Sequence, residues 1–229
     1  MKSLSRAVVL LSAAWLVSNL QAEGWIAVTD RADNPLLIEY LLSADLAQSL
    51  QAVEEIGGRK DPYISDIISA LQGGHRQQLL LRSLLRAAFS PESAGEELER
   101  RLAANQEGLE LLARGLDGFE LPLRQESVRV LRATAAEEFD RYILEQAGWC
   151  VGLLLEQKGL TDAEQSAFLL EILEYAGSRR STLFLDPVLR ILEATRSRIV
   201  AEKALQIARI LAAVRTAFRN RGEWSPARN

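Results

Sequence analysis

The residues best suited to acid–base or nucleophilic chemistry are few in this chain. It has one histidine, His75, and one cysteine, Cys150. A Ser-His-Asp or Cys-His arrangement would have to use His75, which follows Gly73-Gly74 at an expected helix start, where an exposed turn residue is the ordinary outcome. One histidine and one cysteine also fall short of the three or four ligands of a typical zinc site. We therefore expect no catalytic residue, no metal site and no cofactor.

Carboxylates cluster at three places, Glu54-Glu55, Glu96-Glu97-Glu99 and Glu137-Glu138-Asp140. Neighbouring residues of a helix diverge by about 100°, so adjacent acids do not converge on one ion. The group at 96–99 is followed at helical spacing by Arg100 and Arg101, which is typical of a solvated helix face. None of the clusters predicts a calcium or catalytic site.

Arginines are the residues that suggest a binding surface. Arg82 and Arg86 lie one helical turn apart, as do Arg129 and Arg132. Because the guanidinium fork binds carboxylates well, the four could form a basic stripe that holds an acidic partner. We expect them to contribute to partner binding rather than to stability. The competing interpretation is that they are the solvated ends of amphipathic helices.

The N-terminus has the layout of a secretory signal peptide. Lys2 and Arg6 precede the apolar run from Ala7 to Leu20, and Ala22 precedes the polar Glu23. A membrane-spanning helix needs about 20 apolar residues, so cleavage after Ala22 is favoured over a permanent anchor. We expect an exported protein, periplasmic or associated with the envelope, that meets a membrane only if this segment is not cleaved.

Charge and cysteine content narrow the class further. The formal charge of −4 becomes −6 when Lys2 and Arg6 are removed with the leader. An acidic protein is a poor candidate for binding nucleic acid, which requires a basic surface. With a single cysteine no internal disulfide can form, so stability must come from an apolar core.

Prolines after helix-capping residues divide the chain. Asn34-Pro35, Asp61-Pro62, Ser90-Pro91 and Asp186-Pro187 each combine a side chain that caps a helix with a proline suited to its first turn, and Leu121-Pro122 is a weaker member. The starts at 34, 61, 90 and 121 are separated by 27, 29 and 31 residues. A period near 30 residues fits two short helices with tight turns.

Apolar residues between these points recur at helical spacing, and no stretch alternates with period two for long enough to form a confident strand. The segments Asp61–Leu71 and Asp186–Ala194 are similar to each other, and Ile199–Ile207 is similar to the second helix of HEAT-like repeats, with Ser127–Ala133 a looser match. The resemblance implies an all-α fold of stacked antiparallel helix pairs, an α-solenoid. An irregular helical bundle is the alternative.

The pair Glu126-Ser127 provides one sharper enzymatic hypothesis. An exported helical protein with this pair resembles the lytic transglycosylases, which cleave cell-wall glycan, and the resemblance implies Glu126 as the general acid. The Gly-Leu-Met-Gln-type motif of that family is missing, because Met1 is the only methionine. We expect Glu126 to lie instead in the first turn of a helix, where the dipole favours a carboxylate.

We therefore expect a non-catalytic protein–protein interaction or scaffold module of the cell envelope. The alternatives are a small envelope enzyme acting on cell-wall glycan through a carboxylate, and a helical bundle that holds a lipid or peptide between its helices. The expected organisation is a signal peptide at 1–22, an extended entry at 23–33, a HEAT-like repeat domain at 34–219 and a polar tail at 220–229.

Overall fold

The computed structural model describes residues 39–58, 64–88, 105–134, 136–156 and 162–222. Within these ranges the regular secondary structure is α-helix and short 3₁₀ helix, without strands. The expected all-α class is therefore confirmed. The expected signal peptide, the expected entry segment, and Pro35, Pro62 and Pro91 all lie outside the described residues.

The helices follow one another with short connections. The α-helices described are α3 (Leu46–Gly58), α4 (Ile64–Ala70), α5 (His75–Ala88), α7 (Gln106–Gly115), α8 (Leu121–Thr134), α9 (Asp140–Glu156), α10 (Asp162–Arg179), α11 (Leu185–Ala194) and α12 (Arg198–Gly222). Three 3₁₀ turns, η3 (Leu116–Gly118), η4 (Glu137–Phe139) and η5 (Thr182–Phe184), precede α8, α9 and α11.

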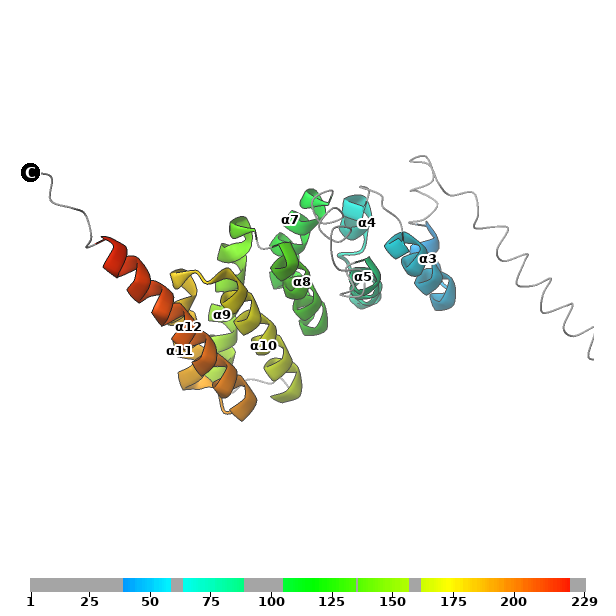
Figure 1. Cartoon of the computed structure of the whole chain (residues 1–229). Helices are drawn as coiled ribbons and strands as arrows, with labels where there is room; N and C mark the ends of the chain where they lie inside the picture. The colour runs from blue at the N-terminus through cyan, green and yellow to red at the C-terminus, as the bar shows by residue number, and fades with distance from the viewer. Residues whose placement is uncertain (1–38, 59–63, 89–104, 135, 157–161, 223–229) are drawn as a thin grey trace, which may run out of the picture.

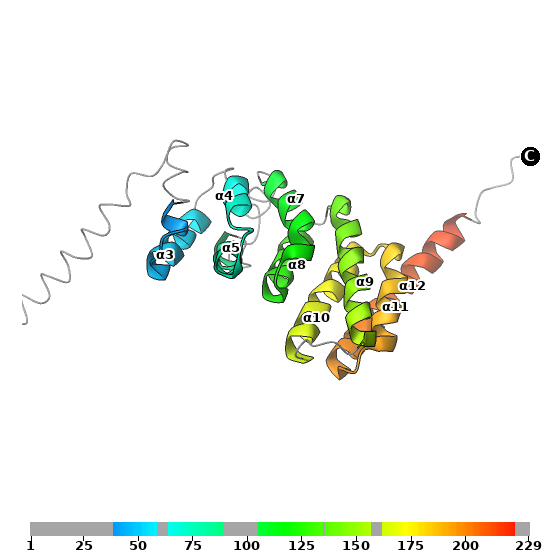
Figure 2. The ribbon, with the colours of Figure 1, turned by 180° about the vertical axis from the view of Figure 1, so that it is seen from behind.

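The helices form a row that runs from α3 to α12 (Figures 1 and 2). One layer is made by α3, α5, α8, α10 and α12, each packed on the next. In the second layer, α4 packs on α7 and α9 packs on α11, whereas contact between α7 and α9 is much weaker. At the centre of the row, the two halves are therefore held together mainly by the contact between α8 and α10 of the first layer.

The core follows the apolar periodicity of the sequence. In α5, the leucines at 80, 81, 84 and 85 are completely buried, and so is Ala88. The start of α3 is capped by Asp45, whose Oδ1 accepts a hydrogen bond of 2.9 Å from the backbone N–H of Ala47. Burial of an aliphatic side chain contributes about 1.5–3 kcal/mol, so these repeated leucine positions account for much of the stability of the layer.

Two glycines allow neighbouring helices to approach closely. A Cβ at Gly57 of α3 would lie 2.6 Å from Cβ of Ala87, and a Cβ at Gly177 of α10 would lie 2.6 Å from Cδ1 of Ile207 in α12. Both distances are shorter than carbon–carbon contact permits. A larger residue at Gly57 would also meet the backbone of Ala87 and Ala88 and would force α3 and α5 apart, whereas at Gly177 the side chain of Ile207 would have to move.

Where α7 and α9 pack weakly, a buried arginine joins the elements. Arg124 in α8 donates through Nε to the carbonyl of Phe119 at 2.7 Å and through Nη2 to the carbonyl of Asp117 at 2.6 Å. Its Nη1 donates to Oε1 of Gln146 in α9 at 3.0 Å. The guanidinium carbon lies 4.3 Å from the ring centroid of Trp149. Burial lowers the pKa of Arg124, with Asp117 acting in the opposite direction.

The expected helix start at Pro187 is confirmed, because α11 begins at Leu185. The expected capping role of Asp186 is wrong. Asp186 lies inside the first turn, where its Oδ2 is 2.9 Å from Nε of Arg190. The preceding 3₁₀ turn is capped instead by Ser181, whose side chain accepts from the backbone N–H of Leu183. The 3₁₀ turn η5 therefore leads the chain into α11, which was the role expected of the Asp186-Pro187 pair.

The spacing of the pairs differs from the expected 30 residues. The first helices of successive pairs, α4, α7, α9 and α11, begin at 64, 106, 140 and 185, which are separated by 42, 34 and 45 residues. Leu121-Pro122 does begin a helix, but that helix is α8, the second of its pair. The expected period therefore combined the start of a second helix, at Leu121, with the start of a first helix, near Pro187, and did not measure the length of one pair.

The last two helices of the first layer end at different kinds of residue. Helix α10 passes through Gly177, continues to Arg179 and stops before Arg180, a residue with a φ of 50°. Helix α12 extends to Gly222, so helix covers the first residues of the expected tail at 220–229.

Candidate functional site: a charged ladder across four helices

Oppositely charged side chains alternate across one layer of the row. We call this set the charged ladder. It comprises Arg82 and Arg86 of α5, Glu126, Arg129 and Arg132 of α8, Glu171 and Glu174 of α10, and Lys203 of α12. The four arginines predicted from the sequence are thus brought to neighbouring positions on two helices that pack together.

Glu126 lies at the first step of the ladder, between α5 and α8. Its side chain is only 6% exposed, and its Oε2 is 3.4 Å from Nε of Arg86 and 3.3 Å from Nη1 of Arg129. Its Oε1 accepts from the same Nη1 of Arg129 at 3.4 Å. The residue is in the second turn of α8 and not in the first as expected. Its partners are therefore guanidinium groups and not the helix N-terminus.

Arg82 adds a third guanidinium to this step. Its buried Nε has no hydrogen-bond partner among the described residues. Burial and the charges of Arg86 and Arg129 lower the pKa of Arg82, whereas the charge of Glu126 raises it. Glu126 thus pairs with Arg86 and Arg129 and lies near the charge of Arg82, so among the described residues arginines outnumber carboxylates at this end of the ladder.

The next step joins α8 to α10. Nη2 of Arg129 is 3.0 Å from Oε1 of Glu171, and Nη2 of Arg132 is 3.6 Å from Oε2 of the same carboxylate. Arg132 also pairs with Glu174. Burial lowers the pKa of Arg129, but the hydrogen bonds that it donates to Glu171 and the charges of Glu126 and Glu171 outweigh this effect, so the pKa is raised. Here charge is balanced, and the arginines also hold two helices together.

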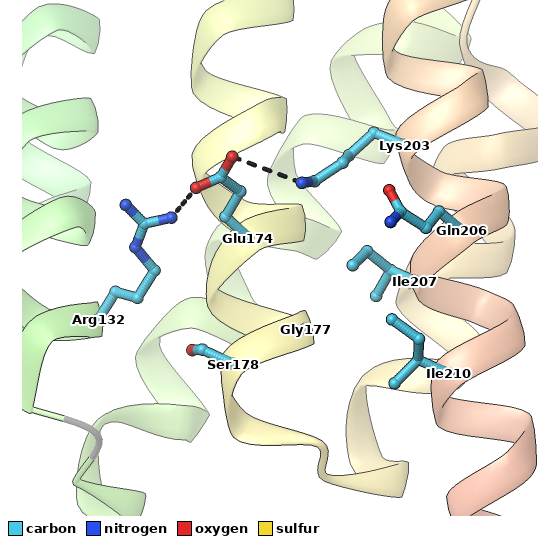
Figure 3. Close-up of a pocket in the computed structure, with 8 residues that line it drawn as sticks. All are labelled: Arg132, Glu174, Gly177, Ser178, Lys203, Gln206, Ile207 and Ile210. Carbon is cyan, nitrogen blue, oxygen red and sulfur yellow. Dashed lines mark hydrogen bonds and ion pairs between the residues drawn. The ribbon is translucent and has the colours of Figure 1, made fainter.

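An open groove lies at the other end of the ladder, between α8, α10 and α12. Its volume is about 520 Å³, and it is lined by Arg132, Glu174, Gly177, Ser178, Lys203, Gln206, Ile207 and Ile210. Glu174 points to Arg132 on one side and to Lys203 on the other, as Figure 3 shows. Nζ of Lys203 is 3.5 Å from Oε1 of Glu174.

Two carboxylates of the ladder, Glu171 and Glu174, were not identified from the sequence, and Glu126 was considered only as a candidate general acid or a first-turn residue. Glu171 and Glu174 are one turn apart, as are Arg129 and Arg132. The matching spacing was a usable signal, but only once α8 and α10 were known to be neighbours. The pairing gives Arg129 and Arg132 a contribution to stability in addition to any role in binding.

The other candidate residues lie apart from the ladder. His75 begins α5 with a side chain that is 80% exposed, and its Nδ1 is 2.8 Å from Oε1 of Glu120. Cys150 is buried, and burial raises the pKa of its thiol to about 12. Trp149 packs edge-on against Phe168 with ring centroids 6.3 Å apart, although part of its ring stays exposed.

One acidic cluster contains a buried polar contact that the sequence did not indicate. Asp140 accepts from the hydroxyl of Tyr175 and from Nε of Arg179, each at 2.9 Å. Burial and the charge of Asp140 raise the pKa of Tyr175. The cluster therefore fastens α9 to α10. The group at 96–99 lies outside the described residues.

Among the described residues, no group of three or more His, Cys, Asp or Glu side chains is placed to hold a metal ion. None of the described helices is both long and apolar enough to cross a membrane. Comparison with models of protein families, with curated proteins and with solved structures gave no match. The function is therefore inferred from the residues of this chain.

Proposed function

We propose that this protein is an exported, non-catalytic interaction or scaffold module of the cell envelope. In this proposal the helix pairs stack as a HEAT-like α-solenoid, and the layer formed by α5, α8, α10 and α12 binds an acidic segment of another protein. Arg82, Arg86, Arg129 and Arg132 make the contacts with that partner.

The observation that carries the proposal is the charge imbalance around Glu126. Arg86 and Arg129 pair with this carboxylate, the charge of Arg82 lies near it, and Nε of Arg82 has no hydrogen-bond partner among the described residues. A guanidinium group without a full set of acceptors favours the arrival of another carboxylate. The side chain of Arg86 is 56% exposed, so a partner protein can contact its guanidinium group directly at the surface.

The arrangement of the helices supports the repeat part of the proposal. Helices α5, α8, α10 and α12 pack in sequence order, each as the second member of a pair. Stacked repeats present an extended surface formed by one helix from each pair. The charged ladder follows this surface across all four helices.

The geometry gives less support to the alternatives. Both oxygens of Glu126 contact arginines, and its carboxylate is almost completely buried, which leaves little room for a glycosidic oxygen. The described groove between α10 and α12 is open, whereas a lipid-binding bundle requires an enclosed apolar cavity. An open charged surface fits a protein partner better.

Site-specific photocrosslinking in intact cells tests the proposal. A benzophenone amino acid replaces Leu79, an exposed residue one turn before Arg82 and Ser83 in α5, or Arg190, an exposed residue of α11 in the other layer. We expect a discrete crosslinked partner from position 79, absent from position 190, and lost when Arg86→Ala is added. Crosslinks from position 190 alone would place the interface on the opposite layer.

A further inference from the structure

The groove between α10 and α12 combines three kinds of side chain along one line. On α12, Lys203, Gln206 and Ile210 occur at spacings of three and four residues, so they lie along one face of the helix. Figure 3 shows this order, with the charged group at one end of the groove and the isoleucines at the other. The groove therefore changes from charged to polar to apolar along its length.

The charged end has more cations than carboxylates. Arg132 and Lys203 both pair with Glu174, which is the one acid among the lining residues, and Arg132 also contacts Glu171 outside the groove. Lys203 reaches Glu174 only at 3.5 Å, and 30% of the Lys203 side chain is exposed. A second carboxylate placed between Arg132 and Lys203 would be complementary in charge.

The rest of the groove offers the contacts that an extended peptide requires. Gln206 is exposed, and its amide forms no hydrogen bond within the described part of the chain, so it can both donate to and accept from a peptide backbone. Ile210 is 36% exposed, next to the buried Ile207. Gly177 on the facing helix has no side chain, and Cδ1 of Ile207 packs against it and forms part of the apolar floor at this end.

We propose that this groove binds an extended peptide segment that carries a carboxylate and an aliphatic side chain. Lys203 and Ile210 are seven residues apart, or about 10 Å along the helix. An extended chain in the polyproline II conformation covers this distance in about three residues, and every third side chain returns to the same side. The segment therefore has an acidic residue and an aliphatic residue separated by two others. The inference rests on the proposed function and adds the chemistry of the partner at the end of the ladder.

Synthetic peptides test the inference with the full mature chain. Fluorescein-labelled peptides in a Gly-Ser background carry one Glu and one Leu, in both orders, with zero to five residues between them. Fluorescence anisotropy measures their affinity. We expect the tightest binding with two intervening residues in one of the two orders, at least about fivefold tighter than with zero or five. Replacing the peptide Leu by Ser, or its Glu by Gln, should weaken binding by a similar factor.

Matched variants locate the site. Ile210→Ser and Lys203→Gln should each weaken the best peptide at least about fivefold, whereas Ile199→Ser and Arg198→Gln, exposed positions of the same helix outside the groove, should not. If Ile210→Ser alters folding, a cycle combining it with the peptide Leu→Ser change still measures their coupling. Independent effects of the two changes would overturn the inference.

The outcomes separate this inference from the proposed function. Binding that depends on Lys203 and Ile210 but not on Arg86 supports the groove even if the rest of the ladder binds no partner. Binding that depends on Arg86 and not on Ile210 rejects the groove and leaves the ladder. A set of peptides without any spacing preference, or without any binding, also rejects the groove.

Discussion

Arg129 of α8 donates to Glu171 of α10 through both Nε and Nη2, which lie 3.3 and 3.0 Å from Oε1. The two residues are 42 positions apart, and the same offset joins Arg132 to Glu174. Because both pairs advance in the same direction along the chain, α8 and α10 run parallel with matched turns. The ladder therefore fixes the register between two helix pairs as well as forming a charged surface.

Glu126 is expected to be the most sensitive carboxylate of the ladder. Glu126→Gln removes the charge that pairs with Arg86 and Arg129 and lies near Arg82, and should lower the free energy of unfolding by about 1–3 kcal/mol. Urea unfolding measures it. The control is Glu110→Gln, which breaks an exposed pair with Arg114 and should change stability by less than about 0.5 kcal/mol. Equal effects of the two substitutions would contradict the central role of Glu126.

Substitutions of Arg86 and Arg132 should separate the effect on partner binding from the effect on the free energy of unfolding. Arg86 is 56% exposed and has one ion-pair contact at 3.4 Å, so Arg86→Ala should change the free energy of unfolding by less than about 0.5 kcal/mol. Arg132 is less exposed and pairs with both Glu171 and Glu174, so Arg132→Ala should cost about 1 kcal/mol or more. Once the partner is isolated, Arg86→Ala should weaken its binding at least about tenfold. Unchanged affinity would mark Arg86 as an ordinary surface charge.

Cys150 should be inert in the folded protein and should make the protein less stable in alkali. Its thiol pKa of about 12 lies above the unfolded value of about 8.5. Below pH 8.5 the full stabilising effect is present, and it is lost as the pH rises toward 12, because the unfolded thiol ionises first. Native protein at pH 8 should resist iodoacetamide and react only in denaturant, which mass spectrometry detects at this single cysteine. Rapid alkylation without unfolding would show an accessible thiol.

His75→Ala should leave partner binding unchanged, because the histidine is 80% exposed and its polar contact with the described residues is a surface ion pair with Glu120. Thermal unfolding should also be nearly unaffected, and Glu120→Gln should behave in the same way. Loss of partner binding in a folded His75→Ala protein would point to a site at the start of α5.

The leader prediction concerns residues outside the described structure. Lys2, Arg6 and the apolar run to Leu20 predict a mature N-terminus at or near Glu23. Intact mass measurement of the exported protein checks it. Recovery of the uncleaved chain in the membrane fraction would show that the segment is an anchor.

The sequence by itself determined the local structure. The spacing of leucines in α5, the Gly73-Gly74 break before His75 and the helix start near Pro187 are all local signals, since helix formation depends on neighbouring residues and their periodicity. The pairing of arginines by one turn was also visible. These signals were enough for the all-α class and for the identity of the candidate arginines.

Only the tertiary structure decided what surrounds those arginines. Glu126 was expected near a helix end, and Glu171 and Glu174 were not selected, because nothing local relates residues 40 or more positions apart. Their positions depend on the register of α5, α8 and α10, to which both the buried leucines and the ion pairs between these helices contribute. Helix packing therefore places carboxylates among the arginines that were expected to form a basic stripe. The result is the charged ladder, with an excess of arginine at one end and the groove at the other.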